Sequence, residues 1–301
     1  MTKNILITGA TGLVGTQLIP FLQKQGHHVT VLSRKKISIP GVNVYLWNVE
    51  QQTIDKDAFL GIDTLIHLAG EGIADKKWTP KRKQQIIDSR VKSAELLYQT
   101  IRETQASVST FVSASAVGYY GNRGEEFLWE DSDPGKGFLS DCCVAWEAAA
   151  DEGISMGIRV VKVRIGLILS EKDGALAAMA RPIKFFVGAP LGSGKQWMPW
   201  IHLDDIVGIF TKALEDETMV GAYNATAPFP VTNKLLTKRI AWHLSRPVWP
   251  VHVPKGVLKV ILGELSMLAL MSSNTAAQKI LDAGFKFKYL DLDEALKEIY
   301  G

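Results

Sequence analysis

Short apolar runs alternate with longer amphipathic stretches along the first half of the chain. Within each run the hydrophobic residues are mostly continuous, a pattern typical of parallel strands that are buried on both faces of a sheet. We expect strands at Asn4–Thr8, His28–Ser33, Val42–Trp47, Thr64–Leu68, Thr110–Ser113 and Arg159–Arg164. Because helical stretches separate them, the pattern predicts an α/β protein with a doubly wound parallel Rossmann sheet.

Two helices between these strands have recognisable ends. The first spans about Gly12–Gln25, and Pro20 inside it is expected to bend or interrupt it. The second begins at the pair Thr79 and Pro80, a hydroxyl cap followed by proline in the first turn, and reaches about residue 104. Arg90 falls within the apolar stripe of this second helix, so its guanidinium needs an anionic partner or a route to water.

The regular alternation stops after Arg164, and a loop rich in Gly, Pro and Trp follows over residues 188–200, where we expect specificity to lie. Further helices are predicted near Asp204 and at Asn233–Leu244, Pro254–Met271 and Leu292–Tyr300. We therefore expect a Rossmann domain over residues 1–165, to which residues 200–226 return. A smaller, mainly helical C-terminal substrate lobe would comprise residues 166–199 and 227–301. The apolar stretch 257–271 packs in this lobe, the interpretation we favour, or pairs with a second subunit.

Composition narrows the class of protein. The 301 residues include 34 Lys and Arg against 31 Asp and Glu, a net charge of +3 that is too weak to indicate nucleic acid binding. The basic run around Trp78 is typical of a solvated helix start, and no stretch is long enough for a membrane span. Adjacent Cys142 and Cys143 suit neither a disulfide nor a metal site. We expect a cytoplasmic monomer or homodimer without metal, nucleic acid or membrane partners, acting on a small molecule.

The sequence TGATGLVG over residues 8–15 directly follows the first strand and directly opens the first helix. In this context the glycines allow backbone to approach a pyrophosphate, whose charge is met by free N–H groups at the helix start. The pattern predicts a dinucleotide site. At the end of the second strand, Ser33 and Arg34 stand where NAD-binding proteins place an acidic residue. A hydroxyl and a cation suit a 2′-phosphate, so NADP(H) is favoured over NAD(H).

Three further stretches are DTLIHLAG over residues 63–70, SASAVGYYG over 113–121 and PWIHLDD over 199–205. With the glycine motif they make the chain resemble the extended short-chain dehydrogenase/reductases, along nearly its whole length. The sequence from His67 to Glu71, the region around Trp78 and the segment from Asp141 to Glu147 resemble more narrowly an atypical, epimerase-like subgroup. The resemblance implies NADP(H) binding and an unidentified small polar substrate.

The chain departs from the superfamily pattern at the catalytic pair. Superfamily enzymes use a serine or threonine, a tyrosine and a lysine four residues after the tyrosine. Matching Ser115 and Glu147 to the family puts Leu139 at the tyrosine and Cys143 at the lysine. Neither side chain replaces what is lost, so we predict Ser115 and Tyr119 as catalytic residues. Aromatic packing under the substrate lobe remains the alternative for Tyr119.

Cys143 is open to two interpretations, a buried small hydrophobe or a reactive thiol, and the first is favoured within a helix stripe. His202 is expected to orient its loop with Asp204 and Asp205 rather than to act as an acid or base. Arg164 has a salt bridge as its alternative to a cofactor contact. The predicted cofactor-binding residues are Gly9, Thr11, Gly12, Leu13, Val14, Gly15, Ser33, Arg34, Leu68, Ala69, Gly70, Arg90 and Arg164.

Two functions remain open at this stage. The first is an NADP(H)-dependent oxidoreductase or epimerase, in which the nicotinamide carries the hydride chemistry. The second is a non-catalytic NADP(H)-binding module that senses redox state or binds a partner. The missing tyrosine and lysine favour the module, whereas Ser115 and the tryptophan-rich loop favour the enzyme.

Overall fold

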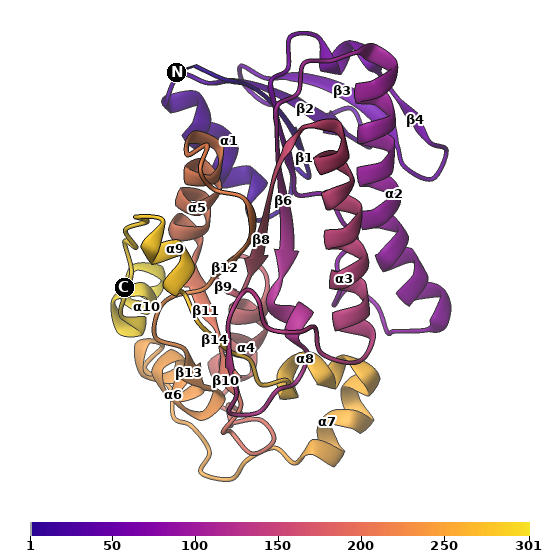
Figure 1. Cartoon of the computed structure of the whole chain (residues 1–301). Coiled ribbons are helices and arrows are strands. Elements are labelled where there is room, and N and C mark those ends of the chain that lie inside the picture. The colour runs from indigo at the N-terminus through magenta and orange to yellow at the C-terminus, as the bar shows by residue number, and fades with distance from the viewer. Residues whose placement is uncertain (1) are drawn as a thin grey trace.

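A central sheet organises the computed structural model, which describes residues 2–301 (Figure 1). Its strands are β1 (Asn4–Thr8), β2 (His28–Ser33), β3 (Asn43–Asn48), β4 (Thr53–Ile54), β5 (Thr64–His67), β6 (Thr110–Ala116), β8 (Arg159–Ile165) and β12 (Gly221–Ala225). They lie in the order β12-β8-β6-β5-β1-β2-β3-β4. Every neighbouring pair is parallel except β3 and β4. The strand order reverses between β1 and β5, the place where doubly wound sheets bind ligands.

Helices cover both faces of this sheet (Figure 1). The helices are α1 (Gly15–Lys24) and α5 (Leu203–Glu215) on one face, and α2 (Pro80–Thr104) and α3 (Phe138–Asp151) on the other. Ile5 and Ile7 of β1 pack with the first pair, whereas Leu6 between them packs with the second. Successive side chains of a strand point to opposite faces, which explains the continuous apolar runs. The predicted doubly wound fold is confirmed.

Element ends differ from the prediction in small ways. Helix α1 begins at Gly15 rather than Gly12, because the intervening residues belong to the glycine loop. Pro20 does not interrupt α1, and it lies on the exposed side. The cap of α2 is confirmed, since the Thr79 hydroxyl accepts a hydrogen bond from the Arg82 amide at 3.1 Å.

A second body of structure lies beyond the carboxyl ends of the strands. Its core is formed by α4 (Ala175–Lys184), α6 (Asn233–His243) and α10 (Leu292–Tyr300). Small strand pairs tie the loops together: β9 (Leu167–Leu169) with β11 (Trp200–His202), β10 (Trp197–Met198) with β13 (Val231–Thr232), and β7 (Phe127–Leu128) with β14 (Asn274–Thr275). The C-terminal region also contains α7 (Lys255–Leu262), η4 (Gly263–Leu265), α8 (Ser266–Leu270) and α9 (Gln278–Asp282). It is the mainly helical region that was predicted. Three short helical segments lie earlier in the chain, namely η1 (Lys56–Phe59), η2 (Val117–Tyr120) and η3 (Glu152–Met156).

After the loop over residues 188–200, the chain adds two more elements to the central sheet. Helix α5 packs on one face, and β12 joins the sheet beside β8. The boundaries of the two lobes, with residues 200–226 assigned to the first, stay a prediction. Trp200 at the end of this loop begins β11. Its side chain is completely buried and donates from Nε1 to the Phe229 carbonyl at 2.9 Å.

The expectation for the apolar stretch 257–271 is also corrected. The predicted single helix is divided at Gly263, whose φ of +59° ends α7. Helix α7 buries only Leu258 and exposes most of Val260 and Ile261, so it is not part of the core. Across residues 2–301, no helix combines the length and hydropathy that a membrane span requires.

Candidate functional site

Two glycines close the loop between β1 and α1. Gly9 has a φ of +75°, and a Cβ there would lie 2.6 Å from the carbonyl carbon of Leu68, just after β5. A Cβ on Gly15 would lie 2.6 Å from the carbonyl oxygen of Gly9. At Gly12 the nearest protein atom would be 3.3 Å away. Packing within the protein explains Gly9 and Gly15, and it leaves Gly12 as the position where a ligand can approach the backbone.

Free backbone donors lie beside these glycines. The N–H groups of Thr11, Leu13 and Val14 donate no hydrogen bond to any other residue within 2–301. They stand at the start of α1, where the helix dipole favours negative charge. Such a cradle fits the pyrophosphate of a dinucleotide.

A buried histidine ties the loop to the rest of the sheet edge. His67 at the end of β5 has Nδ1 2.7 Å from the Thr8 hydroxyl and Nε2 2.9 Å from the Ser93 hydroxyl on α2. Ser93 donates its proton to the Arg90 carbonyl, so Nε2 of a neutral His67 donates to Ser93 and Nδ1 accepts from Thr8. Burial, with the Arg90 charge, lowers the pKa of His67 to about 3. The ring is therefore neutral.

A cleft of about 830 Å³ opens beside the glycine loop, at the carboxyl ends of the central strands. It is lined by predicted cofactor residues, namely Gly9, Thr11, Gly12, Ser33, Arg34, Leu68, Ala69 and Gly70. Its walls also contain residues that the sequence did not single out, among them Trp47, Asn48, Arg82, Gln85 and Lys92. The fold thus brings the glycine loop and the ends of β2 and β5 together around one space of ligand size.

Glu71 holds two arginines at this cleft. Its Oε1 accepts from Arg34 at 2.7 Å and its Oε2 accepts from Arg82 at 3.0 Å. These hydrogen bonds, that from Arg82 most strongly, hold the pKa of Glu71 below its ordinary range. Arg82 was expected to lie on a solvated helix start, which is wrong, because only 7% of it is exposed. Its Nε is buried without a partner in the described chain, a free donor at the cleft wall.

Arg90 enters the sheet edge from α2. Its Nη1 donates to the carbonyls of Glu71 at 3.2 Å and Ile86 at 3.0 Å, and its guanidinium carbon lies 4.7 Å from the ring of Trp146 on α3. Burial lowers the pKa of Arg90. Its Nε and Nη2 make no hydrogen bond within residues 2–301, so a buried cation next to Gly70 has donors to spare.

Ser115 and Arg164 belong to one buried network at the ends of β6 and β8. The Ser115 hydroxyl donates to Glu147 Oε1 at 2.6 Å. Arg164 donates to both carboxylate oxygens of Glu147, at 2.8 and 2.9 Å, and to the Tyr120 hydroxyl at 2.9 Å. The salt bridge foreseen as the alternative for Arg164 is therefore present, and this residue does not line the cleft. A cofactor contact by Arg164 and a catalytic role for Ser115 stay predictions.

Tyr119 stacks on this network from one side. The guanidinium carbon of Arg164 lies 3.6 Å from the centre of its ring, and Tyr120 meets it edge-on at 5.4 Å. The ring is half-buried, and its hydroxyl makes no hydrogen bond to the described part of the chain. The packing foreseen as its alternative role is present, and the free hydroxyl leaves its catalytic role as a prediction.

The two residues matched to the absent tyrosine and lysine are shielded from solvent. Leu139 and Cys143 are buried on α3, and burial raises the pKa of the Cys143 thiol to about 12. Cys142 and Cys143 are both free. His202 caps α5, its Nδ1 accepting from the Asp204 amide at 3.1 Å, so it orients this loop as expected.

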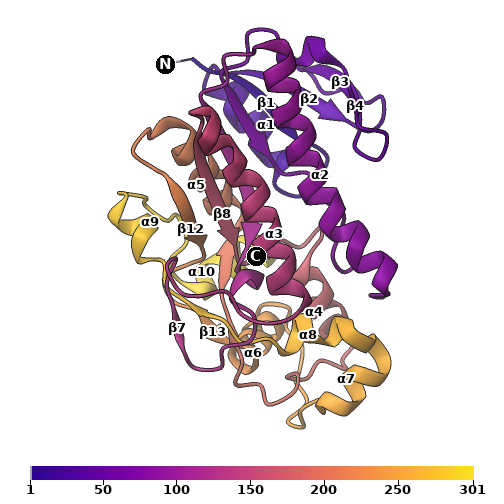
Figure 2. The ribbon, with the colours of Figure 1, turned by 45° about the vertical axis from the view of Figure 1, so that its right-hand side comes forward.

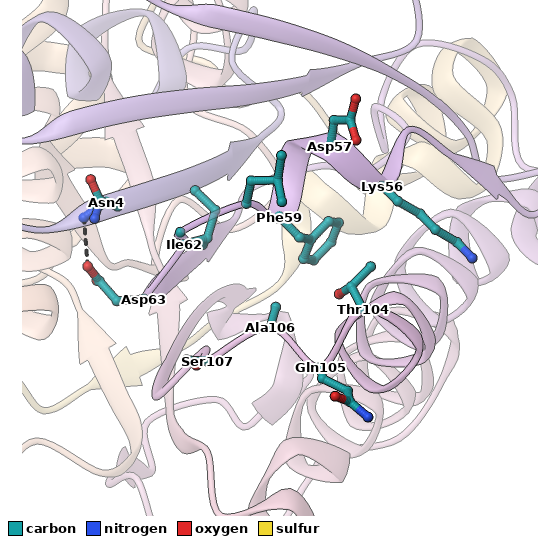
Figure 3. Close-up of a pocket in the computed structure, with 12 residues that line it drawn as sticks. Asn4, Lys56, Asp57, Phe59, Ile62, Asp63, Thr104, Gln105, Ala106 and Ser107 are labelled. Atoms are coloured by element: carbon teal, nitrogen blue, oxygen red, sulfur yellow. Dashed lines mark hydrogen bonds between the residues drawn. The ribbon is translucent and has the colours of Figure 1, made fainter.

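A second cavity, of about 600 Å³, lies at the opposite ends of the strands, beside the amino ends of β1 and β5 (Figure 3). Two of its charged groups already have partners: Asp63 accepts from the Asn4 amide at 2.7 Å, and Lys56 pairs with Glu103 at 3.0 Å. Ligands of doubly wound sheets bind at the other edge. Within residues 2–301, no group of three or more His, Cys, Asp or Glu is placed to hold a metal ion.

The fold, the glycine loop and the cleft define a Rossmann-type dinucleotide-binding protein. Residues 5–225 match the NAD dependent epimerase/dehydratase family, and the chain belongs to this family. Residues 253–299 match a domain of unknown function, DUF1731. Epimerase family protein YfhF of Bacillus subtilis is 37% identical over 98% of this chain and 97% of its own length.

Solved structures agree with this assignment. The human epimerase family protein SDR39U1, crystallised with NADPH, is 30% identical, with a TM-score of 0.85 over 99% of each chain. This relative makes the resemblance to the atypical short-chain dehydrogenase/reductases secure. MoeE5, solved with UDP-glucuronic acid and NAD, shares the fold at 19% identity, with a TM-score of 0.78 over 97% of this chain and 96% of its own.

The neutral state of His67 makes stability depend on pH. Its pKa is about 3 when folded and 6.5 ordinarily, so the unfolded chain binds a proton first as the pH falls. The free energy of unfolding should drop below pH 6.5 by up to about 1.4 kcal/mol per unit, and His67→Gln should remove this slope. Urea unfolding between pH 7 and about 5 measures it. The exposed-histidine control His28→Gln should keep the slope, and an equal slope in His67→Gln would contradict the assignment.

The raised pKa of Cys143 makes this thiol inert. With a pKa of about 12, roughly one molecule in 10⁴ carries the thiolate at pH 8. Mass spectrometry after iodoacetamide treatment should find Cys143 unmodified in the native protein and alkylated in urea. Rapid labelling of the native protein would instead identify a reactive thiol and support the redox-sensing alternative.

Proposed function

We propose that the chain is an NADP(H)-dependent oxidoreductase or epimerase acting on a small polar molecule. The observation that carries this proposal is the cleft, where the glycine loop, Ser33 and Arg34 meet the end of β5. A family whose members use a nicotinamide dinucleotide, and a relative crystallised with NADPH, support it. When bound, the cofactor would supply the hydride chemistry.

The chain's residues would divide the cofactor between them. The free amides of Thr11, Leu13 and Val14 would bind the pyrophosphate, with Gly12 allowing its approach. Ser33 and Arg34 would bind a 2′-phosphate, because a guanidinium and a hydroxyl complement its oxygens. Glu71 would then release Arg34, with Arg82 keeping the carboxylate paired.

We assign Arg90 the place of the absent lysine. Its guanidinium carbon lies 4.7 Å from the ring of Trp146 on α3, the helix that carries Cys143 at the position where the family has lysine. Its Nε and Nη2 are the donors left for a ribose or phosphate oxygen. The guanidinium stays charged despite burial, so it supplies positive charge to the site as lysine does elsewhere.

Proton transfer would fall to Tyr119, whose hydroxyl is not bonded within the described chain. The hydroxyl of Ser115 donates to Glu147 instead. The second candidate, a non-catalytic NADP(H)-binding module, is favoured by the same bond, because it occupies the Ser115 hydroxyl. A cytoplasmic location remains part of the proposal.

Cofactor preference tests the binding part of this proposal. Fluorescence titration should show NADPH binding at least about tenfold more tightly than NADH, because Arg34 makes a charge-assisted contact that only NADPH offers. Arg34→Ala should weaken NADPH binding about tenfold and leave NADH unchanged. Glu71→Gln should strengthen NADPH binding, since it frees Arg34.

The matched control is Lys77→Ala, which removes an exposed cation outside the cleft and should change neither affinity. Tighter binding of NADH than of NADPH by the unaltered protein would overturn the assignment of the cofactor.

Turnover separates the enzyme from the module. With NADPH and a panel of small carbonyl compounds, Tyr119→Phe should lower kcat by about 100-fold or more while NADPH affinity is kept, because only the proton donor is removed. Ser115→Ala tests the other predicted catalytic residue in the same assay, with thermal unfolding as the check on its buried bond. Tight NADPH binding with no turnover of any compound would establish the module instead.

A further inference from the structure

Two long segments of the C-terminal region carry positive charge only. Residues 174–203 and 218–263 contain nine Lys and Arg and no Asp or Glu. The whole chain has only three more basic than acidic residues, so the rest of it is net negative. The small total charge therefore conceals an uneven distribution of charge along the sequence.

Most of these cations have no partner. All nine are exposed. Lys184 pairs with Glu171 at 2.8 Å and Arg239 with Asp293 at 3.4 Å, and none of the others forms an ion pair within residues 2–301. Charges on an exposed surface without internal partners are available to an external anion.

The same two segments also expose large apolar side chains. Helix α7 turns Val260 and Ile261 to solvent, with 87% and 64% of their surface exposed. The others are Phe185, Phe186, Val187, Trp249 and Val251, each more than half exposed. Exposed apolar clusters of this kind mark contact surfaces.

These side chains come from three segments that hydrogen bonds hold together. The Trp249 amide donates to the Gly188 carbonyl at 2.9 Å, and Trp249 Nε1 donates to the Phe186 carbonyl at 2.8 Å. The Gly192 amide donates to the Val253 carbonyl at 2.9 Å, and the stem of Lys255 at the start of α7 lies against Gly192. Residues 185–192, residues 249–253 and α7 form one surface, which we call the basic apolar face. Figures 1 and 2 show α7 at the end of the molecule remote from the N-terminus.

The backbone holds one aromatic side chain outward at a cost. Phe186 has a φ of +62°, the left-handed region that bulky residues rarely adopt. Its ring is 55% exposed, and the Arg246 guanidinium carbon lies 4.8 Å from the ring centre. This conformation closes the C-terminus of α4, where the Phe186 amide donates to the Ile183 carbonyl and the Val187 amide to the Pro182 carbonyl, both at 3.0 Å. It leaves the ring and the Arg246 guanidinium together at the surface.

We propose that the basic apolar face binds an anionic membrane surface. Lys255 and Lys259 would pair with lipid phosphates, while Val260, Ile261 and Trp249 would enter the interface between headgroups and acyl chains. This contact is peripheral and needs no membrane-spanning helix. It goes beyond the proposed cofactor chemistry, since none of these residues lines the cleft.

The composition of the face selects this occupant over others. A second copy of the same face would bring unpaired cations against cations, which disfavours a symmetric dimer through it. Single-stranded nucleic acid could stack on Phe185, Phe186 and Trp249, but the two lysines of α7 share their helix with aliphatic Val260 and Ile261 rather than with aromatic rings. Aliphatic side chains beside lysines are typical of helices that lie in a membrane interface.

Flotation with lipid vesicles tests the proposal on the full chain. Vesicles of phosphatidylcholine with about a third phosphatidylglycerol should bind the protein at least about tenfold more strongly than pure phosphatidylcholine, and added salt should weaken this binding. The double variants Lys255→Glu with Lys259→Glu, and Val260→Asp with Ile261→Asp, should each lower binding about tenfold or more.

Leu60→Asp is the matched control, because Leu60 is 76% exposed at the far edge of the sheet and should leave vesicle binding unchanged. Thermal unfolding checks that every variant is folded. Failure of the unaltered protein to bind anionic vesicles overturns the proposal. So does equal loss in Leu60→Asp, or binding to an oligonucleotide in place of vesicles. NADPH titration is independent of these outcomes.

Discussion

The close approach of Gly9 to the end of β5 sets the geometry of the cleft at the carboxyl ends of the central strands. No side chain fits between the two backbones, because a Cβ on Gly9 would lie 2.6 Å from the Leu68 carbonyl carbon. Next to this contact, His67 joins Thr8 of β1 to Ser93 of α2. Loop, sheet and helix are thus fixed to one another at a single point. Helix α2 then carries Arg82 to the cleft from a fixed position, and Thr11 of the loop lines the same space.

Much of the fold could be predicted because local sequence and tertiary environment agree. The β-branched runs of β1, β2 and β5 are buried on both faces, so hydrophobicity alone located them within a residue. The glycine motif could be interpreted because its strand and helix lie directly on either side. The cap at Thr79 is equally local, since a side chain three residues from its amide partner satisfies it.

The remaining features depend on residues far apart in the sequence. Arg82 looked like part of a solvated basic run, yet Glu71 holds it at the cleft, and nothing local to residues 76–83 reveals that partner. Arg164 is neutralised by Glu147 across two elements, which charge counting along one strand does not show. Helix α7 has the apolar composition of a core helix, and only the structure shows that Leu258 is its single buried residue. The small net charge of the chain gave no indication of the exposed cations in this region.

The buried Arg90 has a consequence for how the lineage of this protein can change. Its guanidinium carbon lies 4.7 Å from the ring of Trp146 on α3, the helix that also carries Cys143. A lysine in place of the buried Cys143 would add a second cation to this part of the protein, with like charges repelling in a low dielectric. The residues at positions 90 and 143 therefore constrain each other, and a lysine at position 143 is best accommodated when Arg90 changes as well.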